Sequence, residues 1–146
     1  MDKKSSIIVG LAEYIDEQII SAGWRQIGRG RSRVALLGPD GMVYKVPANS
    51  NLEANGARDN RREAVLFAKC AGRSFSPGMV EIVEVEDAYG DSIPVLRMAY
   101  VPDDGSEVNN LAEMYEWMAE RGILDLNGSN WHARNGQAIL IDAAGV

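Results

Sequence analysis

The segment from Gly122 to Gly145, GILDLNGSNWHARNGQAILIDAAG, constrains the fold more than any other part of the chain. Four residues separate Asp125 from Asn130, and an apolar run from Ala138 to Ile141 then leads to Asp142. The pattern predicts a loop, a short strand, a turn and a second strand that ends at the last carboxylate. Two carboxylates and a carboxamide that converge in this way are suited to holding magnesium, which prefers oxygen ligands and shares them with phosphates.

This spacing resembles the catalytic segment of the protein-kinase-like fold, in which Asp, four residues and Asn precede a hairpin and a metal-binding Asp. The loop DLNGSN is closest to the DLHPGN form of small-molecule and atypical kinases. The resemblance implies that Asp125 accepts the proton of an acceptor hydroxyl. It also implies that Asn130 and Asp142 hold magnesium. His132 is an alternative proton shuttle, although a structural role fits it better because the kinase scheme gives the base role to Asp125.

Composition bounds the remaining possibilities. The chain has 146 residues, enough for one domain, and its net charge of −6 argues against a nucleic-acid partner. No apolar run reaches the length of a membrane span, and acidic residues interrupt the N-terminal apolar segment, so we expect neither a membrane protein nor a signal peptide. A lone cysteine, Cys70, excludes an internal disulfide and is expected to be a buried, inert thiol. These features are typical of a cytoplasmic protein.

Three strands are predicted in the first half of the chain, over Trp24–Ile27, Arg33–Leu37 and Met42–Val46, with a GPDG turn before the third. Between the first two lie Gly28 and Gly30, which allow a backbone to turn sharply and approach phosphates.

The Gly28–Gly30 segment resembles the glycine-rich loop of kinases. Arg33 stands where that loop has its third glycine, and Ala35 stands where it has valine. The plainer interpretation is an ordinary hairpin with an arginine-rich tip.

Lys45 lies in the sequence VYKVP, where alternation puts it on one face of a strand with Val43. An inward lysine is costly unless it is paired. The sequence resembles the VAIK strand of kinases, which implies that Lys45 holds the nucleotide phosphates. Glu63, on a helix predicted over 58–71, is the implied partner, and Glu53 is the alternative if that helix begins earlier. The alternative for the lysine is a snorkelling position at the sheet edge.

Two more strands are predicted over 80–85 and 93–100, as a hairpin. By position, the segment that follows resembles the kinase hinge, so that the main chain of Met98 and Tyr100 would contact adenine. A helix capped by Ser106 is predicted over 107–121, and an amphipathic helix over about 6–21. The N-terminal helix is expected to pack on the domain, with partner binding as the alternative.

Together these patterns predict an α+β protein that resembles a minimal kinase. It would have a kinase-like N-lobe, with a five-stranded antiparallel sheet and one helix, and a reduced C-lobe with one large helix, the catalytic loop and a β-hairpin. An N-terminal helix would occupy residues 1–22 and one minimal domain residues 23–146. Two departures are Ile123-Leu124 in place of His-Arg before Asp125, and Ala143-Ala144-Gly145 in place of Phe-Gly after Asp142. An activation segment is therefore not expected.

The resemblance implies an ATP- and magnesium-dependent phosphotransferase that acts on a hydroxyl of a protein or a small molecule. It also suggests an origin in a phage or another mobile element. The alternative is a catalytically inactive, kinase-derived binding protein that modulates a host or partner protein. A reduced lower lobe would expose apolar surface that a homodimer could cover.

Overall fold

An antiparallel sheet of five strands forms the centre of the computed structural model, which describes residues 3–48, 55–123 and 128–143. The strands lie in the order β1-β2-β3-β5-β4. Their bounds are β1 Arg25–Arg29, β2 Arg33–Leu37, β3 Met42–Pro47, β4 Val80–Glu86 and β5 Ser92–Ala99. The turn between β2 and β3 is tight because Gly41 adopts a φ of 80°, which favours glycine. In each strand, alternate residues point to opposite faces of this sheet.

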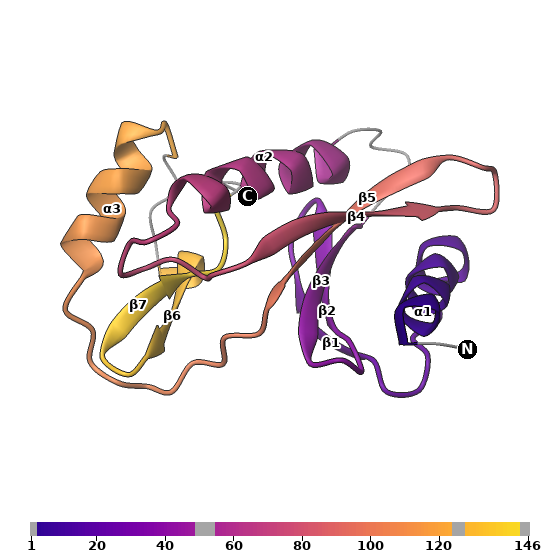
Figure 1. The fold of residues 1–146 in the computed structure, drawn as a ribbon, viewed down its shortest axis with the longest axis horizontal. Helices are drawn as coiled ribbons and strands as arrows, with labels where there is room; N and C mark the ends of the chain where they lie inside the picture. Colours follow the sequence, from indigo (N-terminus) through magenta and orange to yellow (C-terminus); the bar gives the residue numbers. More distant parts are fainter. Residues whose placement is uncertain (1–2, 49–54, 124–127, 144–146) are drawn as a thin grey trace.

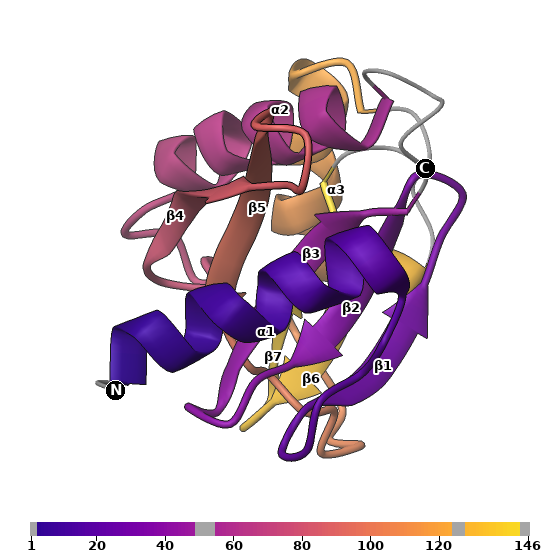
Figure 2. The same ribbon diagram turned by 90° about the vertical axis from the view of Figure 1, so that its right-hand side faces the viewer.

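Two helices cover the two faces of this sheet (Figures 1 and 2). The helix α2 (Asn55–Lys69) packs on the inner face through Leu66 and Phe67, in the larger apolar cluster. The helix α1 (Lys3–Glu17) lies across the outer face. Its buried residues are Ile7, Leu11 and Tyr14, and they join side chains of β2, β3, β4 and β5 in a second cluster. The apolar stripe of α1 is therefore used in packing, as its spacing indicated.

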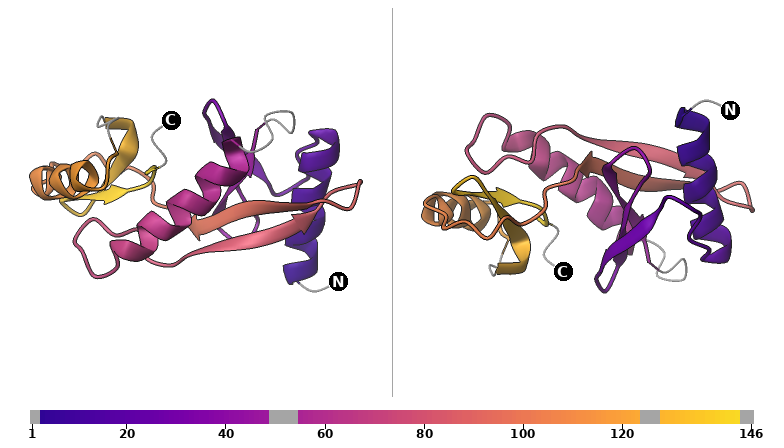
Figure 3. Two further views of the ribbon diagram at one scale, coloured as in Figure 1. Left: turned by 90° about the horizontal axis from the view of Figure 1, so that it is seen from above. Right: turned by 90° about the horizontal axis from the view of Figure 1, so that it is seen from below.

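The C-terminal elements gather at one end of the molecule, opposite to α1 (Figures 1 and 3). They are the helix α3 (Leu111–Glu120), the 3₁₀ helix η2 (Gly128–Asn130) and the hairpin of β6 (Trp131–Arg134) and β7 (Gln137–Leu140). Asn110 joins α3 to this hairpin, since its amide accepts from the Ala138 N–H at 2.7 Å and donates to the Ala138 carbonyl at 3.1 Å. The Leu140 N–H donates to the Phe75 carbonyl at 2.9 Å, which ties β7 to the loop after α2.

The predicted α+β class and the five-stranded antiparallel sheet are confirmed, as are three helices and a two-stranded sheet. Element ends differ. α1 stops four residues before Ser21, and Gln18 adopts a φ of 58°. α3 begins at Leu111, and Ser106 does not cap it, because its hydroxyl donates to Asp104 and accepts from the Gly136 N–H. Within the described ranges, no helix is long and apolar enough to cross a bilayer.

Candidate functional site

Lys45 and Glu63 form a buried ion pair between β3 and α2. The alternation of β3 turns Val43 and Lys45 toward the inner face, and the lysine Nζ donates to Glu63 Oε1. The Glu63 side chain is 0% exposed. Asn60, one helical turn earlier, fixes α2 in this position because its amide donates to the carbonyls of Lys45 and Pro94, both at 2.8 Å. The predicted partners therefore meet, and the alternative, Glu53, lies outside the described residues.

Arg33 occupies the same site, which the sequence analysis did not predict. The side chain is 6% exposed, and its Nη2 lies 3.0 Å from Glu63 Oε2 and 3.2 Å from Asp142 Oδ1. Its Nη1 donates to Asn60 Oδ1 at 3.2 Å. Strand alternation is the signal that would have found it. Ala35 pairs with Lys45 across β2 and β3, so Arg33, two residues before Ala35, shares the lysine's face.

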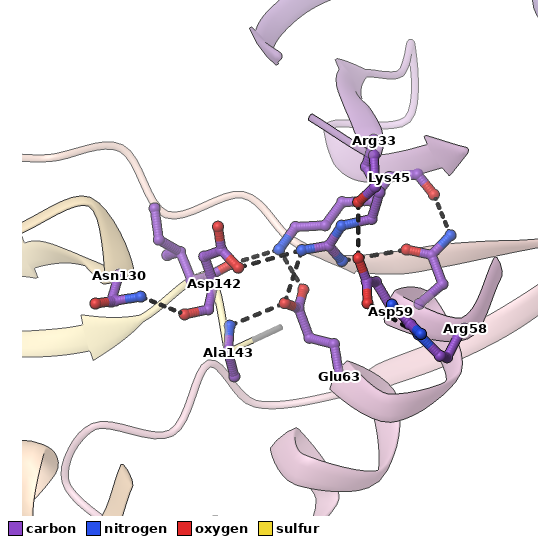
Figure 4. Close-up of polar contacts among 11 residues, drawn as sticks. Arg33, Lys45, Arg58, Asp59, Glu63, Asn130, Asp142 and Ala143 are labelled. Carbon is purple, nitrogen blue, oxygen red and sulfur yellow. Dashed lines mark hydrogen bonds and ion pairs between the residues drawn. The ribbon is translucent and has the colours of Figure 1, made fainter. Parts of the chain in front are cut away.

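Asn130 and the segment from Ile141 to Ala143, here called the C-terminal segment, complete the site (Figure 4). The Asn130 carbonyl accepts from the N–H groups of Ile141 and Asp142, at 2.7 and 3.2 Å, and its side-chain amide donates to the Asp142 carbonyl at 3.1 Å. Lys45 Nζ donates to the Ile141 carbonyl at 2.5 Å, and the Ala143 N–H donates to Glu63 Oε2 at 2.9 Å. The predicted residues Lys45, Glu63, Asn130 and Asp142 thus come together from distant parts of the chain.

The opposite charges of this site favour the ionised forms of Glu63 and Arg33. Burial alone would raise the pKa of Glu63, but the cations of Lys45 and Arg33 outweigh burial and lower that pKa to about 2. Burial would likewise lower the pKa of Arg33, yet the carboxylates of Glu63 and Asp142 raise it. For Lys45, burial prevails over the attraction of Glu63 and lowers the pKa. The strongest of these effects is on Glu63, an anion shared by two cations.

We expect Glu63 to make the stability of the protein depend on acid pH. Its pKa is depressed from 4.5 to about 2 on folding, so its contribution is fully present above pH 4.5 and is lost as the pH falls toward 2. A shift of this size corresponds to about 3 kcal/mol at neutral pH. Urea denaturation at a series of pH values measures the loss, and Glu63→Gln should have a flatter profile between pH 4.5 and 2. Equal slopes for the two proteins would contradict the assignment.

A cavity of about 390 Å³ opens in front of this cluster. All of the residues predicted to contact a nucleotide line it together, namely Gly28, Gly30, Lys45, Met98 and Tyr100. Asp142, predicted to hold magnesium, lines it as well. Arg29, Arg33, Val101, Ser129 and His132 are also among its lining residues. The His132 Nδ1 lies 2.5 Å from the Val101 carbonyl oxygen, which joins β6 to the segment after β5. The predicted base, Asp125, lies outside the described residues.

The lining of this cavity is cationic, although the whole chain carries a net charge of −6. Arg29, Arg33 and Lys45 contribute positive charge, whereas Asp142 is the one carboxylate among the described lining residues. Glu63 lies behind them and is fully buried. A cavity with this charge and with glycines at its edge suits an anionic ligand that approaches the backbone closely.

Magnesium fits the described donors less well than a phosphate does. Asp142, 28% exposed, already receives the Arg33 guanidinium on Oδ1, and a divalent cation there would lie beside a fixed positive charge. Among the residues that the structure describes, no three His, Cys, Asp or Glu side chains are grouped closely enough to hold a metal ion. The side-chain amide of Asn130 contacts the main-chain carbonyl of Asp142, whereas the Asp142 carboxylate pairs with Arg33.

The sequence matches no known protein family, and no curated protein is significantly similar to it.

Proposed function

We propose that the chain is a kinase-like protein that binds ATP in the cavity between β1, β2 and the C-terminal segment and transfers the terminal phosphoryl group to a hydroxyl. The observation that carries this proposal is the buried Lys45–Glu63 pair at the back of a cavity with glycines at its edge. The Met98–Val101 segment and Asp142 line the same cavity, which further supports the proposal.

The residues have separate roles in this proposal. Lys45 contacts the phosphates, and Glu63 holds the lysine in place. The main chain at Met98 and Tyr100 contacts the base. The bond from the terminal phosphorus to ADP breaks as the acceptor oxygen bonds to phosphorus, and the hydroxyl proton passes to Asp125. Positioning and charge neutralisation supply most of the rate enhancement in such transfers.

Magnesium is the metal that the resemblance implies, with Asn130 and Asp142 as its ligands. Because Arg33 holds the Asp142 carboxylate, the metal can bind there only in competition with the guanidinium. The acceptor is a protein side chain or a small molecule with a hydroxyl group.

We expect ATP to stabilise the folded protein. At a concentration one hundred times its Kd, a ligand that binds only the folded state adds about 2.7 kcal/mol of stability, which raises Tm by several degrees. Differential scanning fluorimetry with ATP, GTP and adenosine measures the effect. Adenosine is the matched control, since it lacks the phosphates that the cationic lining would bind. An unchanged Tm with both triphosphates, with and without magnesium, would contradict the proposal.

The second candidate function is a kinase-derived binding protein that acts on a partner without catalysis. The specific observation in its favour is the Arg33–Asp142 ion pair, which engages the carboxylate that a catalytic metal would use. The two functions differ in whether phosphate transfer accompanies the biological effect.

A further inference from the structure

We propose that Arg33 is a resident cation of this site, which binds the phosphates of a nucleoside triphosphate without a divalent metal. The inference rests on the proposed function, in that it takes the ligand of the cavity to be a nucleotide. It adds a binding role for a residue that stands where the resembled loop has glycine.

The position of Arg33 is fixed by contacts on three sides. Its guanidinium bridges Glu63 and Asp142, which lie 79 positions apart in the sequence. The carbonyl of Arg33 accepts from the Gly30 N–H at 2.8 Å, which closes the turn between β1 and β2. The neighbouring Ser32 hydroxyl donates to Asp59 Oδ2 at 2.7 Å and ties the same turn to α2. A buried guanidinium held in this way is already organised for a ligand in the cavity that it lines.

The local charge leaves room for an anion. Arg29, Arg33 and Lys45 carry three positive charges, and the carboxylates of Glu63 and Asp142 neutralise two of them. The charge of Asp59 also acts on Arg33, but Asp59 is paired with Arg58 at 3.8 Å. Guanidinium remains protonated throughout the ordinary pH range, and its planar N–H donors match phosphate oxygens. Magnesium normally supplies this positive charge in phosphate sites. Here a side chain supplies it, and the same side chain repels a metal from Asp142.

The test is calorimetric titration of ATP into the full chain, in EDTA and in magnesium. For the unaltered protein, we expect Kd values that differ by less than about threefold between the two conditions. Arg33→Met should weaken binding in EDTA by at least about tenfold, because it removes charge-assisted hydrogen bonds. Magnesium should recover part of that loss. The Kd of Arg33→Lys for ATP in EDTA should lie between those of the unaltered protein and Arg33→Met, since lysine keeps the charge but cannot bridge both carboxylates.

Arg31→Met is the matched control, because Arg31 is exposed, lies two residues away and is not among the residues that line the cavity. It removes the same charge and should leave both Kd values within about twofold, as long-range charge effects are screened by salt.

A second measurement uses Mn²⁺ alone and follows its electron paramagnetic resonance signal. Arg33→Met should bind Mn²⁺ at least about tenfold more tightly than the unaltered protein, because a fixed cation beside Asp142 is removed. Should Arg33→Met fail to fold, Asp142→Asn serves instead. It keeps the arginine and removes a negative charge, and it should bind ATP in EDTA at least as tightly as the unaltered protein.

Several results would overturn this inference. If the unaltered protein binds ATP tenfold more tightly in magnesium than in EDTA, the metal-free role of Arg33 is wrong, but the proposed function is not affected. The role of Arg33 is also wrong if Arg33→Met binds ATP in EDTA as tightly as the unaltered protein. It is likewise wrong if Asp142→Asn binds ATP in EDTA tenfold more weakly than the unaltered protein. If the unaltered protein binds no nucleotide in either condition, both the proposed function and the role of Arg33 are wrong.

Discussion

Glu63→Gln is expected to destabilise the fold by about 3–5 kcal/mol, the usual cost of breaking a buried ion pair by removing one partner. The glutamate side chain is 0% exposed and accepts from Lys45, Arg33 and the Ala143 N–H. Its loss leaves two buried cations with one fewer anion. Lys45→Met should cost less, because Glu63 then keeps Arg33 and the Ala143 N–H as partners. Urea denaturation of the two variants measures the difference.

The matched control for this prediction is Glu84→Gln on β4. Glu84 also pairs with an arginine, Arg61, but both side chains are exposed, so the change should cost less than about 1 kcal/mol. The double mutant of Lys45 and Glu63 should lose less free energy of unfolding than the two single mutants together, because each change removes the same ion pair. A Glu63→Gln protein as stable as Glu84→Gln would show that the ion pair is unimportant.

Asp125→Asn is expected to slow phosphate transfer by about a hundred- to ten-thousand-fold, the usual contribution of a general base. That range corresponds to roughly 3–5 kcal/mol of activation barrier. The assignment rests on the sequence, where Asp125 precedes Asn130 with four residues between them, since Asp125 lies outside the described residues. ATP binding should be unchanged, because the base contacts the acceptor and not the nucleotide. Transfer from γ-labelled ATP to proteins of a host lysate and to the chain itself measures the rate.

Asp142→Asn is the comparison for this experiment, because that carboxylate lines the cavity proposed to hold the nucleotide. It should abolish transfer, whereas Asp125→Asn should only slow it. The biological effect of both variants should be followed in parallel. If the unaltered protein transfers no phosphate while both variants keep their full effect, the catalytic proposal is wrong and the binding-protein alternative stands.

Much of the fold could be predicted from local sequence patterns. Alternation over Met42–Val46 correctly placed Lys45 on the inner face, and the stripe on α1 correctly indicated a packed helix. The predicted start of α3 was wrong because the Ser106 hydroxyl binds the Gly136 N–H and the helix begins only after Asn110, whose side chain binds Ala138 of the β6–β7 hairpin. Such contacts join residues about 30 apart in the chain, and local propensity has no access to them.

The candidate site was predictable in its paired residues and not in its arginine. Lys45 and Glu63 were assigned from their elements and the resemblance, and each has the other as a partner in the structure. Arg33 was noted only as a departure from a glycine pattern. Its face was predictable from alternation, but its bond to Asp142 spans 109 positions and depends on how the C-terminal segment closes. A residue's distant partner is a tertiary property, and one sequence alone does not specify it.

The two-sided packing of β3 makes the length of the preceding turn as important as its residues. Tyr44 and Val46 face α1 in one apolar cluster, whereas Val43 and Lys45 face α2 and the cavity. A slip of one residue along β3 would exchange the two sets, so that the lysine would enter the apolar layer under α1 and the tyrosine would face the cavity. A single insertion or deletion between Gly38 and Gly41 that shifts β3 by one residue is thus expected to be more damaging than most point substitutions in either cluster. Changes in loop length should be better tolerated before a strand that has only one buried face.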